Sequence, residues 1–224
     1  MARLRKAAKL WRRPESRAFA ESAMVETGGD VFLIDPKELF AADLPLEVEL
    51  GAGKGDFIID RALHHPERNF IAVELSGVVA QMLAVRCGRA GLANLKVVRM
   101  DGRTLVNLML DAESVSAYHI YFPDPWPKER HQKHRLFTPF FVENLARTLV
   151  RDGRIHVATD VREYGEMIFG MMEAGGFIRT DEAAEGCFRT GFGRKFAAAG
   201  KSIHAGVFRR PGRVEESVEK RKSR

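Results

Sequence analysis

The chain has 224 residues, of which 45% are hydrophobic and 29% charged, with a net charge of +6. This length and apolar share predict one α/β-sized globular domain with tails, and no apolar run approaches the roughly 18 residues of a membrane span. Cys87 and Cys187 are the only cysteines and lack the spacing of metal ligands, which favours free thiols in a cytoplasmic protein and disfavours a metal site.

Positive charge is concentrated at the two ends of the chain. Residues 1–18 carry seven Lys or Arg and one acid, and residues 209–224 carry seven Lys or Arg and three acids. We therefore predict a basic, flexible N-terminal arm over 1–30, a single domain over 31–210 and a basic tail over 211–224. Basic appendages around a mildly acidic body are typical of proteins that bind a polyanion, although such tails can also serve solubility alone.

Short apolar runs alternate with segments of helical spacing through most of the domain. Strands are predicted, in chain order, at 46–50, 70–73, 95–98, 117–122 and 154–158. Helices are predicted at 56–65, 78–90, 105–110, 139–150 and 162–174. The segments 177–180 and 204–209 are predicted to form a closing antiparallel pair. Repeated strand–helix units indicate a mostly parallel sheet with helices on both faces, which binds ligands at the carboxyl ends of its strands.

Acidic residues lie at, or just past, the ends of the five predicted parallel strands. They are Glu49, Glu74, Asp101, Asp124 and Asp160. Converging carboxylates repel one another unless a ligand uses them, so the set predicts a ligand that is rich in hydrogen-bond donors or positive charge.

A glycine turn follows the first predicted strand, with Gly51, Gly53 and Gly55 in the spacing G-x-G-x-G. A strand, such a turn and a helix, with an acid ending the next strand, form a nucleotide-type pattern in which Glu74 can accept from ribose hydroxyls. Acids on both sides of the turn disfavour a phosphate there, so S-adenosylmethionine fits better than NAD. A glycine turn with only a structural role is the alternative.

The stretch over 121–136, YFPDPWPKERHQKHRL, is the most distinctive of the chain. Three prolines bracket Asp124 and Trp126, and because proline restricts φ and donates no hydrogen bond, they predict a stiff extended loop. Cations follow the loop, namely Lys128, Arg130, Lys133 and Arg135. An acid and an aromatic residue on a rigid loop beside cations suit a site for a base on a phosphate backbone. The alternative is a stiffened turn with a solvated basic face.

This run, together with VELGAGKGDFI, VELS and ATD, resembles the bacterial tRNA (guanine-N7-)-methyltransferases over roughly residues 46–209. The resemblance implies a Rossmann-like class I S-adenosylmethionine-dependent methyltransferase fold, with an antiparallel C-terminal strand. It also implies methyl transfer to N7 of a variable-loop guanosine in tRNA. Neither a metal, a membrane nor an obligate protein partner is expected, and the protein would be a monomer or a homodimer.

The resemblance also implies roles for individual residues. The methyl donor is expected at the glycine turn and at four acids, Glu49, Glu74, Asp101 and Asp124. Asp124 is expected to be catalytic, because it can stabilise positive charge as this charge moves from sulfur to the guanine ring. The tRNA and its guanosine are expected to contact Lys128, Arg130, Arg135, Asp160 and Thr190.

One late motif departs from the family's pattern. The family's T-x-[YF]-E corresponds to the residues from Thr190 to Gly193, so glycine replaces the carboxylate that the family would use near guanosine. Gly191 and Gly193 also predict a flexible loop. Three other functions therefore stay open: a non-catalytic tRNA-binding relative, a methyltransferase of another nitrogen in nucleic acid or protein, and a nicotinamide-dependent oxidoreductase.

Overall fold

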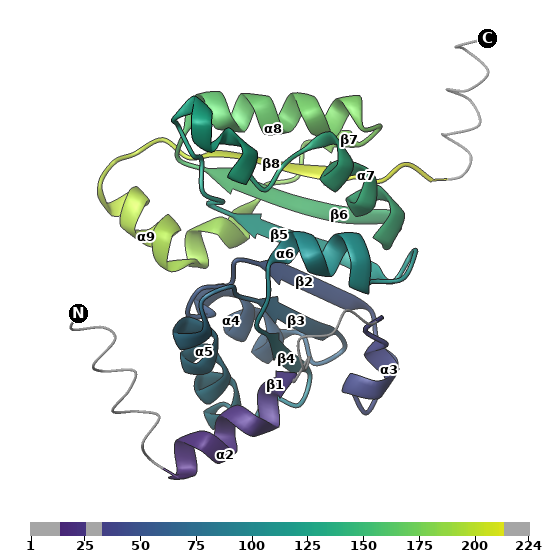
Figure 1. Ribbon diagram of the computed structural model, residues 1–224, viewed down its shortest axis with the longest axis vertical. Coiled ribbons are helices and arrows are strands. Elements are labelled where there is room, and N and C mark those ends of the chain that lie inside the picture. Colours follow the sequence, from purple (N-terminus) through teal and green to yellow (C-terminus); the bar gives the residue numbers. More distant parts are fainter. Residues whose placement is uncertain (1–13, 26–32, 213–224) are drawn as a thin grey trace.

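The computed structural model describes residues 14–25 and 33–212, and in this part of the chain one eight-stranded sheet runs through the molecule (Figure 1). The strand order is β1-β4-β3-β2-β5-β6-β8-β7. The strands are β1 (Met24–Val25), β2 (Leu46–Leu50), β3 (Asn69–Val73), β4 (Leu95–Val98), β5 (Val115–Tyr121), β6 (Leu149–Thr159), β7 (Ile178–Thr180) and β8 (His204–Arg209). Neighbours among β1 to β6 are parallel, whereas β8 is antiparallel to both β6 and β7. The predicted mostly parallel sheet with a closing antiparallel pair is confirmed.

Helices pack on both faces of this sheet (Figure 1). The helical elements are α2 (Pro14–Ala23), α3 (Pro36–Leu39), α4 (Asp56–His64), α5 (Gly77–Arg89), α6 (Gly102–Thr104), the π-helix η1 (Leu105–Met109), the 3-10 helix η2 (Glu129–His134), α7 (Pro139–Thr148), α8 (Arg162–Ala174), the 3-10 helix η3 (Glu185–Arg189) and α9 (Gly191–Ala198). Successive strand residues point to opposite faces. Val48 therefore packs in the core with η1, α7 and α8, and Phe70 in the core with α2, α4 and α5. None of the helices in the described ranges is long and apolar enough to cross a membrane.

Part of the expected N-terminal arm belongs to the domain. Helix α2 packs against α5 so closely that a β-carbon on Gly88 would lie 2.3 Å from the backbone oxygen of Phe19. Ala20 and Ala23 are buried in the same core, and β1 extends the sheet by pairing with β4. Residues 14–25 therefore differ from the flexible arm that the sequence suggested. Residues 1–13 and 26–30 of the predicted arm and 213–224 of the predicted tail lie outside the described residues.

Strand β6 differs most from its predicted bounds. It begins at Leu149, whose buried side chain belongs to the core and whose backbone pairs with Val115 of β5 before the register shifts. Asp152 then turns the backbone with a φ of 58°. Because Leu149 pairs with a strand, α7 ends at Thr148, and the prediction that this helix continues to Val150 is wrong.

Candidate active site

A cavity of about 450 Å³ opens beyond the carboxyl ends of the central parallel strands. Its walls come from the end of β2 and the glycine turn, the end of β3, the start of α6, the proline loop and α9. The lining residues are Leu50, Gly51, Gly53, Val73, Glu74, Leu75, Met100, Asp101, Gly102, Arg103, Tyr121, Phe122, Pro123, Asp124, Trp126, His134, Leu136 and Phe192. The cavity therefore lies where a parallel sheet binds its ligands.

Five of the predicted donor-site residues line this cavity together: Gly51, Gly53, Glu74, Asp101 and Asp124. Glu49 and Gly55 do not line it, and neither do the residues predicted to contact tRNA, which are Lys128, Arg130, Arg135, Asp160 and Thr190. The tertiary structure thus brings acids from three separate strand ends to one cavity, as the sequence predicts, whereas the expected tRNA contacts do not line it.

The glycine turn needs its glycines for the backbone path. Gly51, Gly53 and Gly55 have φ values of 78°, 56° and 73°, in the left-handed region that other residues rarely adopt. This path lets the backbone N–H of Gly53 donate to Oε2 of Glu74 over 3.0 Å, while Ser76 donates to Oε1 over 2.8 Å. The carboxylate of Glu74 is therefore held by two backbone donors at the cavity wall.

Asp101 is paired with Arg103, a cavity residue that the sequence analysis missed. Asp101 caps α6 by accepting from the backbone N–H of Arg103 over 2.8 Å, and the guanidinium donates to the same carboxylate with Nη2 2.6 Å from Oδ2. The hydrogen bonds of Arg103 lower the pKa of Asp101. Asp101 is consequently ionised, and Arg103 brings a cation to the cavity wall.

The proline loop presents Asp124 in a strained backbone. Phe122 and Trp126 on either side have φ values of 56° and 41°, which non-glycine residues rarely adopt and which hold only when the surroundings enforce them. Asp124 is exposed, and its carboxylate makes no hydrogen bond or ion pair to any residue of the described chain. Its acceptor oxygens are therefore available to a ligand.

Arg135 holds this loop instead of facing solvent. Its Nε donates to the carbonyl of Pro125 over 2.9 Å, and its guanidinium lies 5.2 Å above the ring of Tyr164. A further donor reaches the carbonyl of Trp126 over 3.5 Å. The predicted role of Arg135 as a tRNA contact does not agree with this geometry, because planar stacking and backbone bonds use the guanidinium inside the fold.

The segment around Gly193 is helical, so the prediction of a flexible loop there is wrong. Thr190 caps α9: its hydroxyl accepts from the backbone N–H of Gly193 over 2.9 Å and donates to the carbonyl of Cys187 over 2.8 Å. A β-carbon on Gly193 would lie 1.9 Å from that same carbonyl oxygen. Close packing on η3 explains the glycine, and the hydroxyl of Thr190 is used within the fold.

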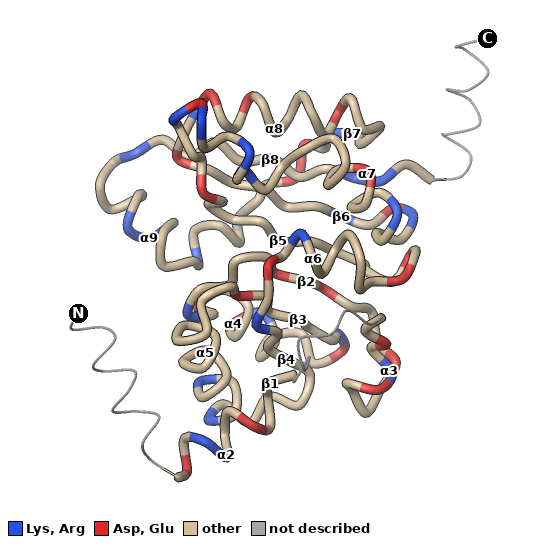
Figure 2. Tube along the Cα trace, in the orientation of Figure 1, with Lys and Arg blue, Asp and Glu red and all other residues tan. Residues whose placement is uncertain are grey.

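The other predicted tRNA contacts lie at the surface. Lys128 and Arg130 are exposed on the segment between β5 and α7, and Asp160 forms an ion pair with Lys201 over 2.9 Å. Figure 2 shows Lys and Arg positions on this segment and on α9. Phe192 of α9 and Trp126 of the proline loop both line the cavity, so each of these two parts of the chain also contributes an aromatic ring to it.

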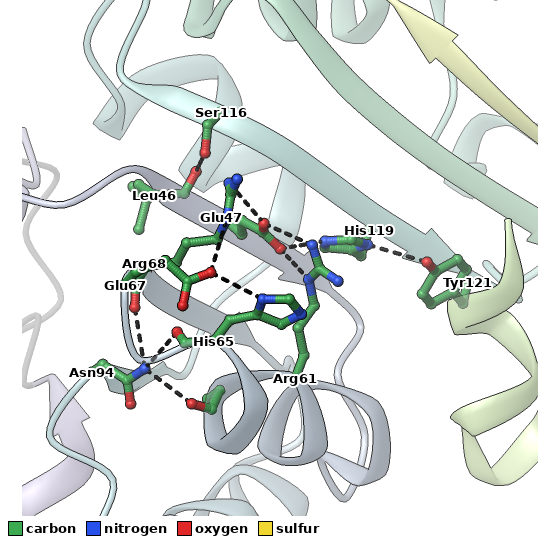
Figure 3. Close-up of polar contacts among 11 residues, drawn as sticks. Leu46, Glu47, Arg61, His65, Glu67, Arg68, Asn94, Ser116, His119 and Tyr121 are labelled. Atoms are coloured by element: carbon green, nitrogen blue, oxygen red, sulfur yellow. Dashed lines mark hydrogen bonds and ion pairs between the residues drawn. The ribbon is translucent and has the colours of Figure 1, made fainter. Parts of the chain in front are cut away.

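A buried polar cluster behind the cavity escaped the sequence analysis (Figure 3). Glu47, which is only 1% exposed, accepts from Arg61 and lies 3.1 Å from Nη1 of Arg68 and 2.9 Å from Nε2 of His119. Nδ1 of His119 lies 3.1 Å from the hydroxyl of Tyr121, a cavity-lining residue. The signal in the sequence was the pair of acids in LEVEL, since alternate residues of a strand share a face.

Tyr121 is therefore a fixed part of the cavity wall. Burial lowers the pKa of His119, which keeps this imidazole neutral. A neutral ring that donates from Nε2 to Glu47 leaves Nδ1 as an acceptor, so the hydroxyl of Tyr121 donates to it. The edge of Phe57 packs against the Tyr121 ring at 5.1 Å between ring centroids.

Glu49 lies on the same strand as Glu47 but has a different environment. It is 3% exposed, and its Oε2 has no hydrogen-bond partner. Burial and the nearby carboxylates of Asp56 and Glu74 raise its pKa well above the ordinary value, against the backbone N–H of Ile58, which lowers it. A buried, partnerless carboxyl oxygen next to the glycine turn, together with the unpaired carboxylate of Asp124 at the cavity, fits a ligand that carries positive charge.

The described residues do not form a metal site. Within 14–25 and 33–212, no three or more His, Cys, Asp or Glu side chains are arranged to hold one.

Comparisons with known proteins agree in pointing to methyl transfer. A family model described as "Putative methyltransferase" matches residues 43–205. A tRNA (guanine-N(7)-)-methyltransferase of Levilactobacillus brevis is 34% identical, with 76% of this chain and 86% of that protein covered. That of Geobacillus kaustophilus is 36% identical, with 79% and 84% covered. The match to that of Psychromonas ingrahamii, at 37% identity, spans only 63% of this chain and 58% of the relative.

Solved structures resemble the chain at much lower sequence identity. The 16S rRNA methyltransferase KamB superimposes with a TM-score of 0.58 at 15% identity, over 79% of this chain and 93% of that one. A 16S rRNA (adenine(1408)-N(1))-methyltransferase of Catenulisporales acidiphilia, solved with the cosubstrate SAM, gives 0.57 at 15% identity over 84% and 97%. At such identity these likenesses concern the fold alone.

Proposed function

The chain belongs to the bacterial tRNA (guanine-N(7)-)-methyltransferase family, and on this premise we propose that it methylates N7 of a guanosine in tRNA. Its fold is the Rossmann-like class I fold of S-adenosylmethionine-dependent methyltransferases, with a mostly parallel sheet and an antiparallel C-terminal strand. The guanosine is proposed to lie in the variable loop of the tRNA, and the reaction to take place in the cytoplasm.

The observation that carries the proposal is the convergence of Glu74, Asp101 and Asp124 with the glycine turn around one cavity. S-adenosylmethionine supplies an activated methyl group on a positively charged sulfur. Glu74 is oriented by two backbone donors at the end of β3, where ribose hydroxyls would be recognised. Asp101 and the glycine turn complete the proposed donor site, with Glu49 behind it.

Asp124 is the proposed catalytic residue. N7 of guanine has an in-plane lone pair and no proton, so the enzyme does not need a general base. What the chain contributes is the approach of the two reactants and a negative charge beside the developing positive charge. The carboxylate of Asp124 supplies this charge from a stiff loop, and no protein cation in the described residues neutralises it.

The proposed tRNA surface combines aromatic rings with cations at the cavity edge. Trp126 and Phe192 line the cavity and can stack on the target base, because stacking needs only the faces of a base and a ring. Lys128 and Arg130 are exposed beside the loop and would contact phosphates. Asp160, now paired with Lys201, would accept from guanine only by exchanging that partner.

The experiment is to incubate the purified protein with S-adenosylmethionine and tRNA that lacks 7-methylguanosine, digest the tRNA, and identify the methylated nucleoside by mass. We expect 7-methylguanosine, and we expect Asp124→Ala to reduce its formation at least 100-fold while the protein stays folded. Asp111→Ala is the matched control, because Asp111 is an exposed acid just before β5, at the opposite edge of the sheet.

Two outcomes would contradict this proposal. A wild-type protein that binds S-adenosylmethionine but methylates another base would show that the site has a different specificity, with Gly193 as the first position to test. A wild-type protein without any methylated product would favour the non-catalytic relative. Near-normal turnover of Asp124→Ala would leave the activity in place and remove Asp124 from its catalytic role.

A further inference from the structure

Two glutamates on one buried face of β2 differ in the partners that surround their carboxyl groups. Glu47 and Glu49 are separated by one residue of β2 and so point to the same side of the sheet. Both are almost fully buried. Glu47 has three cationic or donor partners, whereas Glu49 has no Lys, Arg or His within ion-pair distance among the described residues, and its Oε2 has no partner at all.

The groups around Glu49 cannot neutralise a negative charge on it. Helix α4 contributes a single backbone donor at Ile58 and the carboxylate of Asp56, which itself takes up the charges of Arg86 and Arg194, and the end of β3 contributes Glu74. Strand β5 contributes His119, the register partner of Glu49, and Tyr121, but both ring nitrogens of His119 are used by Glu47 and Tyr121. A buried carboxylate in such surroundings is most stable when it is protonated.

Glu49 nevertheless interacts electrostatically with residues that line the cavity. Glu49 directly precedes Leu50 and Gly51, which line the cavity. Glu74, a lining residue, raises the pKa of Glu49, and Glu49 raises the pKa of Tyr121, another lining residue. A cation that enters beside Glu74 will therefore also act on Glu49, and will favour its ionised form.

We propose that Glu49 is neutral in the ligand-free protein and gives up its proton to solvent when a positively charged nucleoside enters the cavity. The inference rests on the proposed function, because S-adenosylmethionine is the cationic nucleoside concerned. It makes Glu49 a selectivity residue: a cationic ligand supplies the missing partner of a buried carboxylate, and an uncharged nucleoside of similar shape does not.

The sign of the pH dependence follows from linkage. Between the pKa of Glu49 in the bound protein and its higher pKa in the free protein, binding must displace a proton, so the affinity for a cationic ligand falls about tenfold for each unit of decreasing pH. Above that pKa the proton is already absent and the affinity no longer depends on Glu49. The affinity for an uncharged nucleoside is independent of this group throughout.

The test measures proton release by titration calorimetry near pH 6 in two buffers with different enthalpies of ionisation. At this pH the α-ammonium of the ligand, with a pKa of about 7.7–8.0, is already protonated and takes up no proton. We expect S-adenosylmethionine to release about one proton per molecule bound, and the uncharged 5′-methylthioadenosine to release none.

Two variants test whether the released proton comes from Glu49 or from another group at the cavity. Glu49→Gln should bind S-adenosylmethionine with little or no proton release. Glu166→Gln is the matched control, because Glu166 is exposed on α8 and bonded to Arg162, and it should release as many protons as the wild type. If Glu49→Gln does not fold, the comparison of the two ligands on the wild-type protein decides by itself.

Three results would overturn the inference. Tight binding of S-adenosylmethionine without proton release would show that Glu49 does not change its protonation state. Equal release with 5′-methylthioadenosine, or from Glu49→Gln, would assign the proton to another group. These results leave the proposed function intact, whereas an absence of S-adenosylmethionine binding would overturn the proposed function and the inference together.

Discussion

The buried cluster around Glu47 makes a sharp prediction about stability. Glu47→Gln keeps the shape of the side chain but removes its charge, and it leaves Arg61 and Arg68 without their carboxylate. Removing one partner of a buried ion pair costs about 3–5 kcal/mol. The side chains of Arg61 and Arg68 are 27% and 36% exposed, so water can partly replace the lost partner. We therefore expect a loss of about 3 kcal/mol.

The effect of pH on this loss has a defined sign. Burial by itself raises the pKa of Glu47, but hydrogen bonds from Arg61 and His119 and the charge of Arg61 outweigh it and hold the pKa far below its ordinary value. A carboxyl group with a lowered pKa in the folded state stabilises fully above its unfolded pKa and loses this contribution as the pH falls. The difference between wild type and Glu47→Gln is therefore full at pH 7 and shrinks below about pH 4.

The assay is urea denaturation followed by circular dichroism, at pH 7 and again at about pH 3.5. For a chain of this size, a loss of about 3 kcal/mol corresponds to a melting temperature about 6–12 °C lower. Glu67→Gln is the control, since Glu67 is exposed and pairs only with His65 and Arg68, and its midpoint should not move. A loss at pH 7 below about 1 kcal/mol, or one that does not shrink in acid, would refute the reasoning.

Three further substitutions, with Gly191→Ala for comparison, are tested by the same denaturation assay. Glu49→Gln should stabilise the ligand-free protein by about 1–3 kcal/mol at pH 8, and this gain should vanish below about pH 4, where the carboxyl is protonated in both states; a loss at pH 8 would contradict it. Thr190→Ala removes the cap of α9 and should cost about 1 kcal/mol. Gly193→Ala should cost about 1–3 kcal/mol because its β-carbon meets a backbone oxygen, whereas Gly191→Ala, with open space except for one side chain, should cost less.

Local spacing in the sequence determined most of the architecture and much of the cavity. Strand and helix periodicities depend on residues a few positions apart, so the alternation from β2 to α8 could be predicted, and with it the edge at which a ligand binds. The glycines of the turn and the prolines around Asp124 act through their own backbone restrictions. Because parallel strands end at one edge, the acids that follow them had to converge.

The tertiary structure alone decided which of these acids are paired. Glu47 and Glu49 occupy equivalent positions of one strand, and only the packing of α4 and β5 places Arg61 and His119 beside the first and no cation beside the second. In the same way, contact with η3 made a capped helix of the segment around Gly193, and contact with Tyr164 turned Arg135 inward. These outcomes depend on side chains that are far apart in the chain, and periodicity carries no information about which of them meet.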